Sequence, residues 1–288
     1  MYEHILVATG GSPWSDAAVA YAIAITVRTG GTLHILTVLT NPAVYATPDV
    51  MGGSEVVAEI MERDGHELLA RAADQARQHE VACAVECRWG GVSEMILQTA
   101  DEAACDLIVL GARTVTGWKR LRLGHITNAV ASKAKQPVLF VKQPPSVTPG
   151  SPLGRRILVA TGGSPWSDAA VDYAIALAQR EHFTLCLLYV VPKKRRLRRG
   201  MDELDGEHIL QRSQTRATNA GVDTTTVLAH GDVARTVVDT AVEQMCDAIM
   251  LGSRGATGWK RLMIGGISNA VIVTTQLPVL VVKSFLGV

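Results

Sequence analysis

Short apolar runs alternate with longer segments of helical periodicity along the whole chain. The run at 4–8 is apolar at nearly every position, which is typical of a strand covered on both faces. The segment 14–28 has apolar residues at helical spacing. The pattern predicts strands near His4–Ala8, Thr32–Val38, Ala82–Cys87, Leu107–Leu110, Val138–Val141, Arg156–Ala160, Thr184–Val190, Asp223–Ala229, Ala248–Leu251 and Val279–Val282, and first-half helices near Trp14–Arg28, Ser54–His79, Val92–Ala103 and Gly124–Ala134.

Each half of this pattern holds five strands with helical crossovers. Crossovers of that length predict a parallel sheet with helices on both faces, hence an α/β fold. We expect two tandem doubly wound, Rossmann-like domains, each a five-stranded parallel sheet of strand order 3-2-1-4-5. A ligand of such a sheet binds between its first and fourth strands, at their C-terminal ends.

The two halves are copies of one unit. Ile5–Val19 and Ile157–Val171 share the same fifteen letters, which indicates duplication. We expect domains at 1–143 and 155–288, joined by the proline-rich linker 144–154. The second copy lacks eleven residues between its second strand and second helix, where the first has an aperiodic segment that we interpret as a connection rather than a lid.

The shared stretch predicts a strand, a glycine turn and a capped helix. Gly10 and Gly11 permit a tight turn, Ser12 suits a helix N-cap, and Pro13 suits the first helical position. Anion and nucleotide sites are often built this way, but a βα corner without a ligand has the same local sequence. The corner alone therefore leaves both interpretations open.

A second glycine pattern follows the fourth strand of each copy. The first copy has Gly111, and then Gly124 at the start of a helix. The second has Gly252, Gly255 and Gly265. Glycines at these places would let backbone N–H groups line a phosphate cradle.

Together, the strand order, the repeated corner and the late glycines resemble the universal stress protein family in its tandem form. The resemblance implies a stress-response module. It also implies an ATP-binding class with the pattern Gly, two residues, Gly, nine residues, Gly, Ser or Thr, and with an Asp after the first strand. ATP or another adenine nucleotide, with or without Mg²⁺, is the implied ligand, and none is required for the fold.

The chain departs from that pattern in both copies. The Asp position is Gly10 in the first copy and Gly162 in the second, and the Ser/Thr position is His125 in one and Gly266 in the other. The second loop glycine is retained only in the second copy, which therefore fits the pattern better. We expect nucleotide binding there through Thr161, Gly162, Gly163, Val190, Gly252, Arg254, Gly255, Gly265, Gly266, Ile267 and Ser268, and more weakly in the first copy through Thr9, Gly10, Val38, Gly111, Arg113, Gly124, His125 and Thr127.

Catalytic interpretations have less support. A nucleophile elbow would need glycine where Trp14 stands, and the loop of ATP pyrophosphatases would need Asp and Ser where Pro13 and Trp14 stand. The histidines and cysteines lack metal-ligand spacing. We expect no enzymatic activity beyond slow, incidental ATP hydrolysis. The alternative function is a scaffold or adaptor that binds no nucleotide and acts through its surface and dimer interface.

Composition and charge limit the partners. The net charge of +1 gives no global attraction to nucleic acid, and no apolar run reaches the length of a membrane span. The basic run Lys193–Arg199 is interpreted as a solvated loop, with an anion surface as the alternative. We expect a cytoplasmic protein whose copies pair through Val138–Val141 and Val279–Val282, with a homodimer and protein partners left open.

Overall fold

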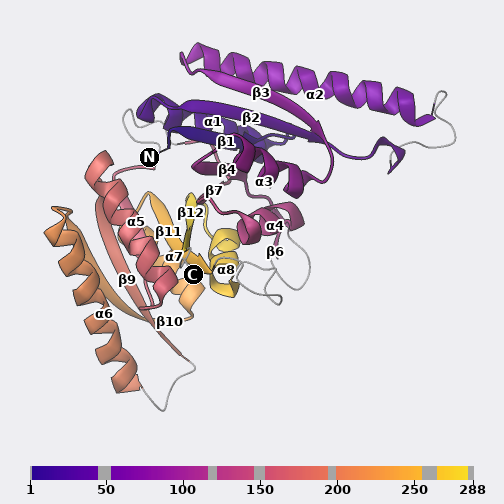
Figure 1. The fold of residues 1–288 in the computed structure, drawn as a ribbon. Coiled ribbons are helices and arrows are strands. Elements are labelled where there is room, and N and C mark those ends of the chain that lie inside the picture. The colour runs from indigo at the N-terminus through magenta and orange to yellow at the C-terminus, as the bar shows by residue number, and fades with distance from the viewer. Residues whose placement is uncertain are drawn as a thin grey trace. The chain divides into compact units, whose positions relative to one another are not determined.

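The computed structural model describes residues 2–44, 53–115, 122–145, 153–193, 199–254 and 265–284 (Figure 1). The strands are β1 (His4–Ala8), β2 (Thr32–Leu39), β3 (Cys83–Trp89), β4 (Leu107–Gly111), β5 (Thr114–Val115), β6 (Arg122–Leu123), β7 (Val138–Val141), β8 (Arg156–Ala160), β9 (Thr184–Pro192), β10 (Thr224–Gly231), β11 (Ala248–Arg254) and β12 (Val279–Ser284). The helices are α1 (Pro13–Thr29), η1 (Pro42–Val44), α2 (Gly53–Gln78), α3 (Val92–Glu102), α4 (His125–Lys133), α5 (Pro165–Glu181), α6 (Arg199–Asn219), α7 (Val233–Glu243) and α8 (Gly266–Thr274).

The chain forms two compact units that do not follow the repeat boundary. One unit contains Met1–Gly111 and Val141–Pro145, and the other contains Ala112–Phe140 and Ser146–Val288. Helix α4 and most of β7, which the first repeat encodes, therefore belong to the second unit. The predicted linker 144–154 lies largely outside the described residues.

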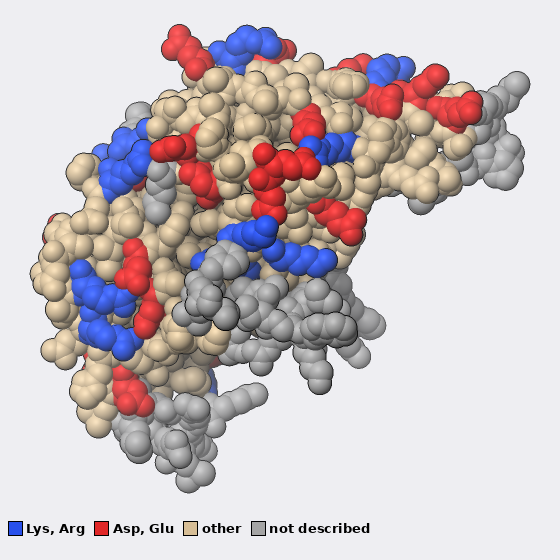
Figure 2. Space-filling model, in the orientation of Figure 1, with Lys and Arg blue, Asp and Glu red and all other residues tan. Residues whose placement is uncertain are grey.

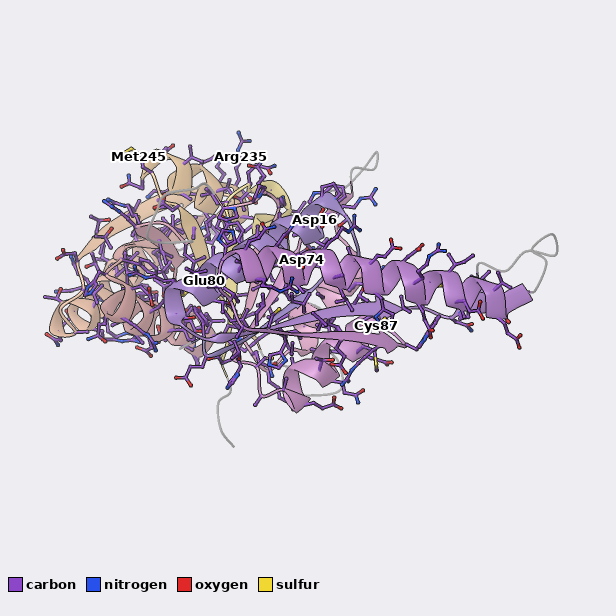
Figure 3. All side chains as sticks on the ribbon, turned by 90° about the horizontal axis from the view of Figure 1, so that it is seen from above. Asp16, Asp74, Glu80, Cys87, Arg235 and Met245 are labelled. Atoms are coloured by element: carbon purple, nitrogen blue, oxygen red, sulfur yellow. The ribbon has the colours of Figure 1, made fainter. Side chains whose placement is uncertain are left out.

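In the first unit, four parallel strands run in the order β4-β1-β2-β3. Ile5 of β1 lies opposite Leu33 of β2 and Leu107 of β4. Helices α1 and α2 pack on this sheet, and α3 contacts β1 and β2 (Figure 1). Figure 3 shows α2 lying along the strands, with Asp74 on the helix and Cys87 on β3. The order 3-2-1-4 agrees with the predicted topology as far as this unit reaches.

The second unit contains the complete predicted order. Its parallel strands run β10-β9-β8-β11-β12, which is 3-2-1-4-5. Strand β7 adds to β12 as an antiparallel sixth strand, with Leu139 opposite Leu280 and Val138 opposite Val281. The predicted pairing of these two strands is confirmed. It covers apolar edges that would otherwise be exposed.

Buried strands and capped helices explain why the sequence adopts these elements. Ile5, Leu6 and Val7 are fully buried, as expected of a strand covered on both faces. Ser12 caps α1 and Ser164 caps α5, each in a reciprocal capping box with the serine three residues on. The repeated stretch therefore forms a strand, a glycine turn and a capped helix, as predicted.

Two short features were not predicted. Strands β5 and β6 pair antiparallel, with Thr114 opposite Leu123. Two-residue strands are too short to show periodicity, which explains why the hydrophobic pattern missed them. The aperiodic segment after β2 begins with η1, and its continuation at 45–52 lies outside the described residues.

Candidate functional site

The C-terminal ends of the first and fourth strands lie side by side in the second unit. Strand β8 pairs with β11, and Ala160 lies opposite Leu251. Thr161 and Gly162 therefore emerge from the sheet beside Gly252. This edge is the predicted switch point of the doubly wound sheet.

The βα corner satisfies its own backbone donors. The Oγ of Ser167 accepts hydrogen bonds from the backbone N–H of Gly162 at 3.2 Å and of Ser164 at 3.0 Å. The N–H of Gly163, at a positive φ of 70°, donates to the Thr161 hydroxyl at 3.4 Å. These three donors are thus already engaged. The corner positions the start of α5, and its glycines do not supply a ready phosphate cradle.

Gly252 is required by packing. A Cβ atom at this position would overlap the backbone carbonyl of Trp166 in the first turn of α5. Gly111 stands in the same relation to Trp14 in the first unit. The first glycine of the late pattern therefore lets a helix start approach a strand end, and this contact accounts for it without a ligand.

The start of α8 has the geometry of an open cradle. Gly265 is its N-cap, with an ordinary φ of −53° and no side-chain capping bond. A Cβ atom at Gly265 or Gly266 would meet no atom of the described residues within 4 Å, and both residues are exposed. Ser268, in the same turn, is buried. Exposed first-turn N–H groups without a side-chain cap are suited to an anion.

The first repeat's counterpart of this helix start is the start of α4, which also lies in the second unit. Its N-cap Gly124 also lacks a side-chain capping bond, and among the described residues a Cβ atom there would meet the Thr127 hydroxyl alone, at 3.8 Å. His125 places an exposed imidazole at the first helical position. This helix start therefore carries a side chain where α8 has the open surface of Gly266.

Charged groups near β11 are held by other partners. Lys283 of β12 is 7% exposed, and its ammonium group donates to the Ser253 hydroxyl at 3.4 Å. Burial lowers the pKa of Lys283 to about 8. Asp168, in the first turn of α5, binds the guanidinium of Arg212 at 2.9 Å. Asp168 is therefore already paired and is poorly placed to replace the acid missing at Gly162.

Both halves of the chain match the sequence model of the Universal stress protein family, at residues 1–142 and 154–283. The chain belongs to the universal stress protein family.

Relatives with the same family name cover one or both repeats. Universal stress protein YxiE of Bacillus subtilis is 30% identical over 150 residues, which cover 44% of this chain and 98% of YxiE. Universal stress protein Rv2005c of Mycobacterium tuberculosis is 24% identical over 296 residues, 97% of this chain and 96% of that protein. The crystal structure of a universal stress protein from Archaeoglobus fulgidus has a TM-score of 0.74 at 21% identity and covers 98% of this chain and 99% of its own. The tandem form and the fold are thus those of the family.

The predicted second-repeat site residues of this universal stress protein lie in several different places. Thr161, Gly162 and Gly252 lie at the switch-point edge, and Gly265 to Ser268 form the first turn of α8. Val190 is buried in β9 opposite Ala229, and Gly163 belongs to the corner. Gly255 and the Arg254 side chain lie outside the described residues.

The first-repeat candidates are divided between the two compact units. Thr9, Gly10, Val38 and Gly111 belong to the first unit, and Arg113, Gly124, His125 and Thr127 to the second. Thr9 is buried, and its hydroxyl has no hydrogen-bond partner in the described part of the chain. Arg113 and His125 are exposed. The hydrophobic pattern gave no signal for this division, because it follows from contacts between distant segments.

Charged side chains of both signs are mixed on the described surface that Figure 2 shows. Of the basic run Lys193–Arg199, only Lys193 has a described side chain, and its backbone N–H donates to the Gly231 carbonyl at 3.2 Å. Within the described ranges, no three His, Cys, Asp or Glu side chains gather as a metal site, and no helix is long and apolar enough to cross a membrane.

Proposed function

We propose that this universal stress protein binds an adenine nucleotide at the switch-point edge of its second repeat. The phosphates would lie on the first turn of α8, and the nucleoside between the ends of β8, β9 and β11. The proposal is of binding and regulation within a stress response. Turnover is not part of it.

The start of α8 carries the proposal. Among the described residues, Gly265 and Gly266 have neither a positive φ nor a close packing neighbour that demands glycine, and they leave open space where a side chain would stand. Gly252 and Gly163 do have packing reasons, since their Cβ atoms would meet the Trp166 backbone and the Ile209 side chain. Packing and backbone conformation therefore do not account for the glycines at the start of α8, whereas a bound anion would need the space that they leave.

The absence of an Asp at position 162 lowers the affinity that we expect for the nucleotide. Gly162 stands where the family's binding class has an Asp, and the nearby Asp168 is held by Arg212. Loss of one charge-assisted hydrogen bond lowers affinity roughly ten- to hundredfold. We therefore propose weak, exchangeable binding of ATP or a related adenine nucleotide, with Mg²⁺ accompanying the phosphates as an optional partner.

A ligand-free scaffold is the second candidate. The observations that favour it are the engaged donors of the βα corner and the absence of both an acid at Gly162 and a hydroxyl at Gly266. Such a protein would act through its surface, as a monomer or a dimer, on a protein partner.

Two measurements on the purified full-length protein distinguish these functions. The protein is first denatured after gel filtration, and the supernatant is analysed for adenine nucleotides by chromatography. ATP with Mg²⁺ is then titrated into nucleotide-free protein by calorimetry. The proposal expects saturable, weak binding at one site per chain. Absence of heat at millimolar ATP, together with no released nucleotide, would favour the scaffold.

A further inference from the structure

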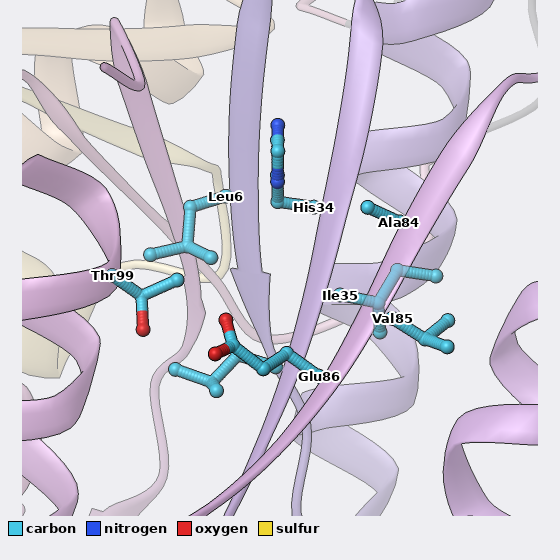
Figure 4. Close-up of a pocket in the computed structure, with 8 residues that line it drawn as sticks. Leu6, His34, Ile35, Ala84, Val85, Glu86 and Thr99 are labelled. Carbon is cyan, nitrogen blue, oxygen red and sulfur yellow. The ribbon is translucent and has the colours of Figure 1, made fainter. Parts of the chain in front are cut away.

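The first unit contains a cavity away from the switch-point edge. Its volume is about 140 Å³, and it lies on the sheet face that carries α3 (Figure 4). Strands β1, β2 and β3 form its floor, and α3 supplies Thr99. The lining residues are Leu6, His34, Ile35, Leu36, Ala84, Val85, Glu86 and Thr99.

Two oxygen-bearing side chains line an otherwise largely apolar hollow. Thr99 is 3% exposed, and its Oγ1 has no hydrogen-bond partner within the described ranges. A buried hydroxyl without a partner is costly, so the site is incomplete without a polar guest. Figure 4 shows Glu86 facing Leu6 and Thr99 across the hollow. The guest would thus meet a carboxylate on one side and a hydroxyl on the other.

The charge around Glu86 is negative. Arg88 donates from Nε to Glu86 Oε1 at 2.5 Å and from Nη2 to Glu102 Oε2 at 2.5 Å, so one guanidinium serves two carboxylates. Burial, and then the charge of His4, lower the pKa of His34 against the opposing effect of Glu86. This lowered pKa disfavours the protonated, positively charged form of the His34 imidazole. A cationic guest is favoured.

In the second unit a basic side chain crosses the equivalent sheet face. There Arg156 of β8 reaches across to the Thr225 hydroxyl, with its Nη2 at 2.8 Å, and to Gln244 Oε1 at 3.4 Å. The first repeat has His4 and Ala84 at the positions of Arg156 and Thr225. The shorter side chains leave the hollow open.

The acidic group is also particular to the first repeat. Val227 occupies in β10 the position that Glu86 occupies in β3, while Thr240 of α7 retains the threonine of α3. The duplication has thus produced one version of this sheet face that carries a basic side chain and one hollow version that carries an acidic side chain. A ligand site confined to the first repeat would require both features, the open hollow and the carboxylate.

We propose that the cavity binds a small primary alkylammonium ion, with its ammonium group between the Glu86 carboxylate and the Thr99 hydroxyl and its hydrocarbon chain against Leu6 and Leu36. The volume has room for about four or five groups of the size of a water molecule, at ~30 Å³ each. A four-carbon amine matches that size. A single carboxylate and a single hydroxyl are too few oxygen ligands for a bare divalent metal ion.

Calorimetric titration of the full-length protein with n-butylammonium tests the site, with n-butanol and butyrate as neutral and anionic probes of the same shape. Saturable binding is expected for the ammonium ion, at least tenfold tighter than for butanol. Glu86→Gln should weaken it at least tenfold. Glu102→Gln is the matched control, since it removes the same charge from the Arg88 network without removing a lining residue, and it should change affinity less than threefold, roughly within ordinary surface effects.

Filling the hollow provides a second, independent variant. Ala84→Thr copies the residue of the second repeat and should abolish butylammonium binding while the thermal melt stays cooperative. In the wild type, the NMR signals of the His34 ring should shift on saturation. Equal binding of butanol and butylammonium, retained affinity in Glu86→Gln or Ala84→Thr, or no shift at His34 would each overturn the proposal. So would a hollow that takes up water alone, seen as no heat with any probe.

Discussion

The ammonium group of Lys283 donates a hydrogen bond to the backbone carbonyl of Ala131. Lys283 lies on β12, in the second repeat, and Ala131 lies on α4, which the first repeat encodes. The same ammonium group reaches Ser253 at the end of β11. One buried cation therefore connects the added helix to the strand that leads to the proposed nucleotide site, and no carboxylate within the described residues pairs with it.

This burial predicts a pH dependence of stability. The pKa of Lys283 is lowered from 10.5 to about 8, so the unfolded chain binds more protons between these values. Stability from this group must rise as the pH increases through that window, by about 3 kcal/mol in total. Urea unfolding of the wild type and of Lys283→Met from about pH 7 to pH 10 gives the free energy of unfolding of each protein. The difference between the two free energies should change with pH by the contribution of Lys283. A difference that stays constant with pH would show that Lys283 keeps an ordinary pKa.

Gly252 should be intolerant of even one methyl group. In Gly252→Ala the new Cβ overlaps the Trp166 carbonyl, and the start of α5 must move away from the end of β11. We expect a loss of about 2 kcal/mol or more in the free energy of unfolding. Gly162→Ala is the control, because its Cβ meets no atom within 4 Å. Equal thermal melts for the two variants would contradict the packing role of Gly252.

Equivalent helix glycines should respond differently in the two repeats. A Cβ at Gly206 of α6 would lie 2.5 Å from a Tyr189 ring carbon, whereas at Gly65 of α2 the nearest atom is in Leu39, at 3.3 Å. Alanine is favoured over glycine within helices by about 1 kcal/mol. Gly65→Ala should therefore be nearly neutral, and Gly206→Ala should destabilise by about 1–3 kcal/mol. Chemical denaturation decides, and the reverse order would show that the Tyr189 ring moves aside without cost.

Local sequence was sufficient to predict most of the fold. The strands β1, β7 and β8 begin and end where the apolar runs do, because fully buried strands require nearly continuous apolar residues. The capped corner after β8 was predictable from Ser164 and Pro165, whose roles depend only on neighbouring residues. These features are local, and so the sequence pattern contained them.

The site was less predictable because its glycines have different causes. Gly252, Gly163 and Gly265 look alike in sequence, yet the first packs against Trp166, the second has a positive φ beside Ile209, and only the third faces open space. The cavity at Glu86 was not predicted either. A comparison of the two repeats could have indicated it, because Ala84 in the first repeat is smaller than its counterpart Thr225 in the second.

The division of the first repeat between two compact units also limits which experiments are informative. Cutting the chain between the repeats would separate β7 from β12, with which it pairs, and would expose both apolar strands. Single substitutions in the full-length chain avoid this. The predicted ranking of the two repeats is therefore best tested by matched variants of Gly124 and Gly265.

The central claim is tested most directly by the ATP affinity of wild type, Gly265→Val and Gly124→Val, measured by calorimetry on the full-length protein. A side chain at Gly265 meets no atom of the described residues, so the free energy of unfolding should stay within about 1 kcal/mol of the wild-type value. The account predicts that Gly265→Val abolishes ATP binding, while Gly124→Val leaves most of it. If wild type binds ATP and Gly265→Val binds it equally well, the start of α8 is not the phosphate site and the account is wrong.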